Sequence, residues 1–205
     1  MQGLIIETST NHACLILADQ GRMSAHSLLG GGPNLSKSLG KEVQELLSLH
    51  PSFHADFVAV GTGPGSYTGV RVGAAMAKAL AFGWQVPLFG FCSLTAFRPD
   101  CNGPFMILVD ARMGGIYSLK GKGVQFDEPR LLTSDEVLKE PDPFFSPHPA
   151  DIQKRISSDR LIQETGLDLP FLSAECCRRA LTEKSSALEP LPLCYLERKP
   201  LNHLK

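Results

Sequence analysis

A cluster of glycines between a strand and a helix constrains this chain more than any other feature of its sequence. Five glycines lie between positions 61 and 73, after the apolar run Phe57–Val60 and at the start of a helical pattern that extends from about Val70 to Phe82. Glycine accepts positive φ angles and lets other backbone approach closely. The segment therefore predicts a buried strand, a tight loop and a helix, with other backbone packed against the loop.

A glycine-rich loop at a helix start can also bind phosphate, because free N–H groups at a helix N-terminus attract anions. The known phosphate-loop patterns are absent here. No Gly-Lys-Ser/Thr follows, and Ser66 occupies the place of the third glycine of a dinucleotide-binding loop. A nucleophile elbow centred on Ser66 would need glycines where Pro64 and Thr68 stand. Phosphate binding is therefore the less favoured interpretation of this loop.

The helix after the loop is apolar or small on nearly all sides, with Arg71 and Lys78 as its charged residues. Its smallest residues form a row that repeats every four positions: Gly69, Gly73, Ala77 and Ala81. Such a row lets another helix approach closely, and a helix that is apolar all round needs cover on more than one face. Either the neighbouring helix, Ser36–Leu49, supplies this cover, or the two helices together bind another protein. We favour the second interpretation.

The first half of the chain predicts an α/β unit. Short apolar runs between turn residues are typical of strands, and apolar residues at i, i+4, i+7 and i+8 are typical of a helix. The expected strands are Gly3–Glu7, Ala13–Ala18, Met23–Leu28, Phe57–Val60 and Pro87–Phe91, and the expected helices are Ser36–Leu49 and Val70–Phe82. Asp19–Gly21 forms a tight turn, Pro51 ends the first helix, and Gly83 caps the second.

The opening pattern recurs in the second half. Phe105–Val109 is followed by Asp110 much as the first apolar run is followed by Glu7, and a short turn and a second apolar strand come after each acid. This recurrence indicates either a duplication, with a boundary near residue 100, or two unrelated hairpins. A duplication divides the chain into residues 1–100 and residues 101–205.

The remainder of the second half gives weaker patterns. Thr133–Glu136 is a capping box that opens a short helix. We expect an irregular loop over Pro141–Pro149, short helical pieces at Ile152–Ile156, Arg160–Thr165 and Leu172–Thr182, and a last strand at Leu191–Leu196.

No catalytic or metal-binding set can be assembled from the sequence. His50 and His54 have the spacing of helical metal ligands, but Pro51 lies between them and interrupts the helix. Glu7 and Asp110 follow apolar strands, and neither is followed by a glycine that would let a phosphate approach. We expect both acids to hold turns by accepting hydrogen bonds from backbone N–H groups.

Composition limits the remaining classes of function. The formal net charge is −1, so the whole chain has no electrostatic footprint for nucleic acid. The six cysteines show no CxxC pair and are expected to be reduced. The apolar runs are too short to span a membrane, and no secretory signal is expected, which predicts a cytoplasmic protein.

The glycine-rich stretch Gly61–Gly73 resembles the signature GxGPGSxTGxRxG of the TsaB (YeaZ) family, with every fixed position filled. Three further segments resemble motifs of this family: Leu4–Thr10 its opening strand and turn, Asp110–Tyr117 its DARxGxxY segment, and Tyr195–Arg198 the Tyr-Leu-Arg near its C-terminus. Glu7 stands where the family usually has Asp.

The resemblance implies a duplicated RNase-H-like, actin-like ATPase fold in two lobes, the second shortened. It implies a non-catalytic subunit without metal or cofactor that pairs with its paralogue TsaD, which transfers threonylcarbamoyl to the adenosine next to the anticodon of tRNA. The ATPase TsaE joins the pair, and tRNA is contacted mainly through the complex. The chain alone could form a homodimer. An active ATPase or phosphotransferase is the alternative, and a metallopeptidase is a third class.

The resemblance also places the partner on the helices of the first half. The residues expected to contact TsaD are Leu39, Val43, Gly69, Val70, Gly73, Ala74, Ala77, Lys78 and Ala81. The residues of the family-signature loop are Gly63, Pro64, Gly65, Ser66, Thr68 and Arg71.

Overall fold

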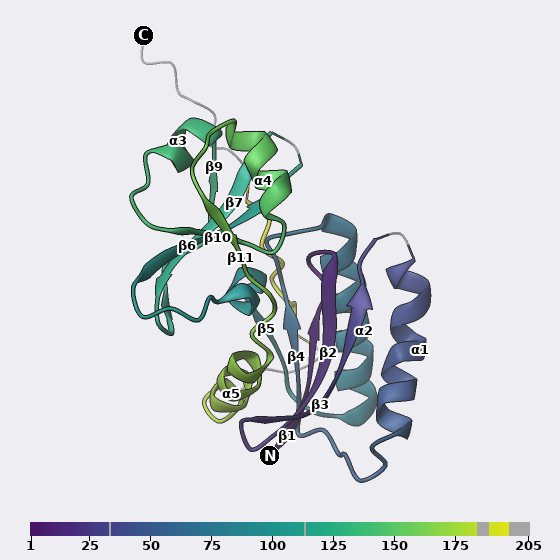
Figure 1. Ribbon diagram of the computed structural model, residues 1–205. Coiled ribbons are helices and arrows are strands. Elements are labelled where there is room, and N and C mark those ends of the chain that lie inside the picture. The colour runs from purple at the N-terminus through teal and green to yellow at the C-terminus, as the bar shows by residue number, and fades with distance from the viewer. Residues whose placement is uncertain (33, 113, 184–188, 197–205) are drawn as a thin grey trace.

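The computed structural model of this chain contains two β-sheets with helices packed on them (Figure 1). It describes all of the 205 residues except 33, 113, 184–188 and 197–205. Met113 of the Asp110–Tyr117 motif and the last two residues of the Tyr195–Arg198 motif therefore lie outside the described residues. Within the described residues, no helix has the length and apolar character needed to cross a membrane.

The first sheet confirms the strands expected in the first half. Its strands are β1 (Gln2–Glu7), β2 (His12–Asp19), β3 (Arg22–Gly30), β4 (Phe57–Gly61) and β5 (Leu88–Phe91), in the spatial order β3-β2-β1-β4-β5. β2 runs antiparallel to β1 and β3 antiparallel to β2, whereas β4 and β5 run parallel to β1. Gln20 and Gly21 both have positive φ, which the tight β2–β3 turn requires.

The second sheet repeats this arrangement. It contains β6 (Pro104–Asp110), β7 (Ile116–Lys122), β8 (Gln125–Phe126), β9 (Arg130–Leu132), β10 (Phe144–Ser146) and β11 (Ile162–Glu164). β7 is antiparallel to β6 and β9 to β7, while β10 and β11 are parallel to β6. The order β9-β7-β6-β10-β11 thus reproduces the order β3-β2-β1-β4-β5 with the same directions. This match confirms the duplication.

Helices cover both faces of the first sheet (Figure 1). α1 (Leu35–Ser48) and α2 (Tyr67–Trp84) pack on one face over a core that includes Leu4 and Ile6. α5 (Leu169–Ala180) packs on the other face, over the neighbouring Ile5. β1 is therefore buried on both sides. Because α5 follows the second sheet in sequence and yet packs on the first, the division at residue 100 stays a prediction.

Shorter helices follow β5. They are the 3-10 helix η1 (Ser93–Phe97), α3 (Ser134–Leu138) and α4 (Pro149–Ile156). The predicted capping box is confirmed, because Thr133 Oγ1 accepts from the Glu136 N–H and the Glu136 carboxylate accepts from the Thr133 N–H.

Four local predictions were wrong. The proline-rich segment Pro141–Pro149 contains β10, in which Phe144–Ser146 is buried between β6 and β11. Arg160–Thr165 contains the edge strand β11 and no helix. Leu191–Leu196 is not a strand: Pro190 and Pro192 remove backbone donors, and the Cys194 N–H donates to Thr62 O just beyond the end of β4. Gly83 lies inside α2, whose C-cap is Gln85 with φ 57°.

Candidate functional site

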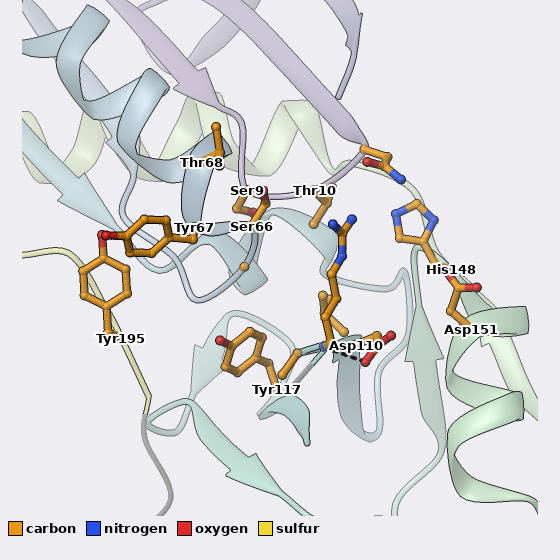
Figure 2. Close-up of a pocket in the computed structure, with 15 residues that line it drawn as sticks. Ser9, Thr10, Ser66, Tyr67, Thr68, Asp110, Tyr117, His148, Asp151 and Tyr195 are labelled. Atoms are coloured by element: carbon orange, nitrogen blue, oxygen red, sulfur yellow. Dashed lines mark hydrogen bonds between the residues drawn. The ribbon is translucent and has the colours of Figure 1, made fainter. Parts of the chain in front are cut away.

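A cavity of about 540 Å³ lies between the two sheets (Figure 2). Its walls come from the turn after β1, the first turn of α2, the turn after β6, the start of α4 and Tyr195 of the C-terminal segment. The parallel strands β1, β4, β6 and β10 all lead into these walls at their carboxyl ends. Ligand sites of α/β sheets occur at this edge. The cavity is therefore the candidate ligand-binding site.

The two acids at the strand ends occupy equivalent positions and hold equivalent turns. Glu7 Oε1 accepts from the Ser9 N–H at 2.5 Å, and Asp110 Oδ1 accepts from the Arg112 N–H at 2.8 Å. Each acid thus bonds to the backbone two residues ahead, as Asx-type turns do. The prediction that both acids hold turns is confirmed.

Glu7 is buried and does not reach the cavity. Its side chain is 0% exposed, and its Oε2 lies beside Gly61 without a hydrogen-bond partner among the described residues. Burial raises the pKa of the Glu7 carboxyl, and the nearby Ser9 and Ser93 oppose this shift only in part. A carboxyl in this position cannot hold a hydrated metal–phosphate group in the cavity.

Glu7→Gln is expected to make the protein more stable than the wild type at neutral pH, because the amide stays uncharged in its buried position. Because the folded-state pKa of Glu7 is raised above its ordinary value of 4.5, stability falls as the pH rises from that value. The amide removes this dependence, so the difference between the two proteins should vanish near pH 4 and grow toward pH 7. Urea unfolding at several pH values measures this difference in stability.

Glu45→Gln, on the exposed surface of α1, is the control and should change stability by less than about 0.5 kcal/mol. A Glu7→Gln protein with the pH profile of the wild type would contradict the prediction.

Asp110 lines the cavity, but an arginine neutralises it. Arg155 of α4 donates through Nε to Asp110 Oδ1 at 3.0 Å and through Nη2 to Oδ2 at 3.5 Å. The same guanidinium donates to the carbonyl of Arg112. Neither strand-end carboxylate is therefore available to a ligand, because Glu7 is buried and Asp110 is paired with Arg155.

The signature loop also directs its polar groups toward its own chain. Ser66 is the N-cap of α2: its Oγ accepts from the Gly69 N–H at 3.3 Å, and its N–H donates to Ser9 O at 2.6 Å. A Cβ on Gly65 would lie 2.5 Å from the same Ser9 oxygen. The glycines therefore permit close packing of the loop on the turn after β1, which confirms the predicted close backbone approach. Thr68 is exposed beside it, and Gly63 has φ 94° before a cis bond to Pro64.

The small-residue row of α2 faces its own sheet. A Cβ on Gly69 would overlap Thr8 O, and one on Gly73 would overlap Thr8 Oγ1. Thr8 Oγ1 in turn donates to Gly69 O at 2.8 Å. Ala77 and Ala81 are both 0% exposed. The prediction that this row is available to another protein was wrong, because Thr8 in the turn after β1 and the sheet beneath already cover it.

The other residues expected at the interface are in part buried and in part accessible. Leu39, Val43 and Val70 are buried, and the two α1 residues face the sheet. Ala74 is half-buried and Lys78 is exposed, so these two remain candidates for partner contact. The outward face of α2 is defined here as the exposed residues between its two ends, which are Arg71, Ala75, Lys78, Ala79 and Phe82.

The start of this outward face is joined to the C-terminal segment. Arg71 Nε donates to Tyr195 Oη at 3.1 Å, and the Arg71 guanidinium lies 4.0 Å from the centre of the Tyr67 ring. Figure 2 shows Tyr67 and Tyr195 together at the edge of the cavity, with ring centroids 5.5 Å apart. In the sequence, Arg71 and Tyr195 belong to separate motifs, 124 residues apart, and their contact was not predicted. The sequence feature that could have indicated the contact is that both motifs resemble one family.

The fold and the cavity define the class of protein. Two units with one strand order, each with an acid at the end of its first strand, face a shared cavity in the duplicated RNase-H-like, actin-like ATPase fold. Two solved structures share this fold. One is YeaZ from Pseudomonas aeruginosa, with a TM-score of 0.75 and 21% identity over 95% of this chain and 99% of that one. The other, described as a protein with similarity to peptidase YEAZ from the same organism, has a TM-score of 0.77 and 22% identity over 96% and 99%.

Sequence comparisons identify the family within this class. The family model described as TsaD, tRNA N6-adenosine threonylcarbamoyltransferase, matches residues 33–172. The tRNA threonylcarbamoyladenosine biosynthesis protein TsaB of Escherichia coli K12 is 34% identical over 124 residues, which are 57% of this chain and 53% of that protein. TsaB of Bacillus subtilis 168 is 32% identical over 117 residues, 51% of each. The chain belongs to the family that the TsaD model describes and, within it, to the TsaB (YeaZ) proteins. It spans about half the length of the curated relatives that it matches.

Proposed function

We propose that this chain acts in the synthesis of threonylcarbamoyladenosine in tRNA as a non-catalytic subunit that activates a TsaD partner. The names of the curated relatives support the assignment to this pathway, and the geometry of the cavity supports a non-catalytic role. The observation that carries the non-catalytic role is that neither strand-end acid is available to a ligand. Glu7 is buried behind its own turn, and Asp110 is paired with Arg155. Neither carboxylate is free to hold a metal–phosphate group, which is what an active ATPase of this fold would require.

We further propose that TsaD binds the outward face of α2. This face carries two small residues, Ala75 and Ala79, between the charged Arg71 and Lys78 and the aromatic Phe82. Phe82 is 64% exposed, so its ring can reach a partner without rearrangement of the helix. Small residues in the middle of a helix face let a partner helix approach closely, and an exposed aromatic ring supplies an anchor.

The neighbouring helix extends this proposed surface. Gly40 of α1 is exposed, and a Cβ on it would lie 3.5 Å from Met76 Cε of α2. Gly40 thus leaves room for the Met76 side chain where the two helices meet. In this proposal TsaE joins the pair and tRNA is bound mainly by the complex, consistent with the net charge of −1. A homodimer of the isolated chain would use the same surface.

Reconstitution of the tRNA modification tests the proposed role. Purified TsaD and TsaE with threonylcarbamoyl-adenylate and substrate tRNA are expected to form the modified adenosine rapidly when this chain is present and at least about tenfold more slowly when it is absent. Nucleoside analysis by mass spectrometry measures the product. The chain alone, with ATP and tRNA, is expected to give no modified adenosine. Equal rates with and without the chain would contradict the proposal.

A further inference from the structure

Two histidines from opposite halves of the molecule meet at the rim of the cavity. His12 begins β2 in the first sheet, and His148 follows β10 in the second sheet, where it is the N-cap of α4. Their ring centroids lie 4.7 Å apart, with 33° between the ring planes. In Figure 2, His148 stands beside the turn that leads into β2. The contact joins the two turns that close one end of the cavity.

The His148 ring is poorly placed to accept a proton. Its Nε2 is buried and has no hydrogen-bond partner among the described residues, while its backbone N–H donates to Ser146 Oγ at 3.0 Å. An imidazolium needs an acceptor for each of its two N–H groups, whereas neutral imidazole needs only one. A second imidazole packed against the ring adds repulsion when both are charged. The geometry therefore favours the neutral form of His148.

Charged groups around the ring affect the equilibrium between neutral and charged His148. Asp151 on α4 and Glu164 on β11 favour a charged His148, while His12 on β2 and Arg112 in the turn after β6 oppose it. Burial is the largest influence, and it lowers the pKa of His148 below its ordinary value of 6.5. The two carboxylates thus compensate only in part.

We propose that His12 and His148 form a pH-sensitive contact that keeps the rim of the cavity closed at neutral pH and loosens on acidification. Because the folded-state pKa of His148 is lowered, the stabilisation is fully present above pH 6.5 and is lost as the pH falls below that value. This contact lies at the rim of the cavity, and the proposal does not depend on the proposed partner surface on α2.

Histidine NMR titration and hydrogen exchange test the proposal in the full-length chain. We expect the His148 ring to titrate below pH 6.5. Exchange of the amides in Ser9–Asn11 and Asp110–Arg112, corrected for the intrinsic pH dependence, should rise as the pH falls from 7.5 to 5.5. The rise should stay within about tenfold, because pH 5.5 lies only about one pH unit below the ordinary pKa of histidine.

Two variants separate this contact from a general effect of acid. His148→Phe keeps a ring against His12 without a titrating nitrogen and should remove most of the rise in exchange. His26→Gln, an exposed histidine on β3 of the first sheet, should keep the wild-type rise. Titration of His148 at or above pH 6.5 would overturn the proposal, even if His148→Phe failed to fold. A His148→Phe protein with the full wild-type rise would also overturn it.

Discussion

Gly69→Ala is expected to destabilise the protein by about 3 kcal/mol or more, although alanine is the better helix former. The added Cβ would overlap the backbone oxygen of Thr8, which belongs to the turn after β1 and cannot rotate away. Overpacking of a rigid core typically costs about 1–3 kcal/mol, and here the obstacle is backbone on both sides. The substitution must also displace the bond from Thr8 Oγ1 to Gly69 O. The gain in helix propensity, about 1 kcal/mol, is smaller than this cost.

Gly83→Ala in the same helix is the matched control. A Cβ on Gly83 meets nothing within 4 Å, and the residue is exposed. This variant should therefore gain about 0.5–1 kcal/mol from reduced backbone entropy of the unfolded chain. Urea unfolding of both variants measures the two changes. Gly69→Ala with wild-type stability would mean that α2 does not rest on Thr8 as described.

The strand pattern of the first sheet could be predicted because each signal was local. The apolar runs of β1 and β2 and the turn at Gln20 and Gly21 lie within a few residues of each other. The recurrence of an acid after β6 then indicated the duplication, which the strand order of the second sheet confirms.

The strands β10 and β11 could not be recognised from the sequence. Each has three residues, which is too short to show a period of two, and prolines surround β10. Burial between β6 and β11 makes Phe144–Ser146 a strand, and this environment is set by residues far away in the sequence.

The orientation of α2 was the main error, and it has a physical cause. A helix with small or apolar residues on nearly all sides does not indicate which face is buried. Its small row was correctly recognised as a site of close approach, but the neighbour is Thr8 in the same chain. Pairs such as Arg155 with Asp110, and His12 with His148, join residues too distant in sequence for any local pattern to predict.

Phe82→Glu is expected to leave the protein folded and to weaken TsaD binding by at least about thirty-fold. Phe82 is 64% exposed, so a carboxylate there stays in water in the free chain and costs little stability. In the proposed complex the same carboxylate would be buried against the partner helix. Loss of a buried aromatic anchor typically costs about 2 kcal/mol or more of binding free energy.

Leu161→Glu provides the matched control, because Leu161 is a comparably exposed apolar residue, 73% exposed, next to β11 of the second sheet. It should bind TsaD with wild-type affinity. Unfolding curves of both variants establish that each is folded before binding is compared.

The affinity of TsaD for the wild type, Phe82→Glu and Leu161→Glu, measured by isothermal titration calorimetry, tests the proposed docking through α2 most directly. We expect strong binding by the wild type and Leu161→Glu and at least about thirty-fold weaker binding by Phe82→Glu. Equal affinity of all three proteins would contradict it.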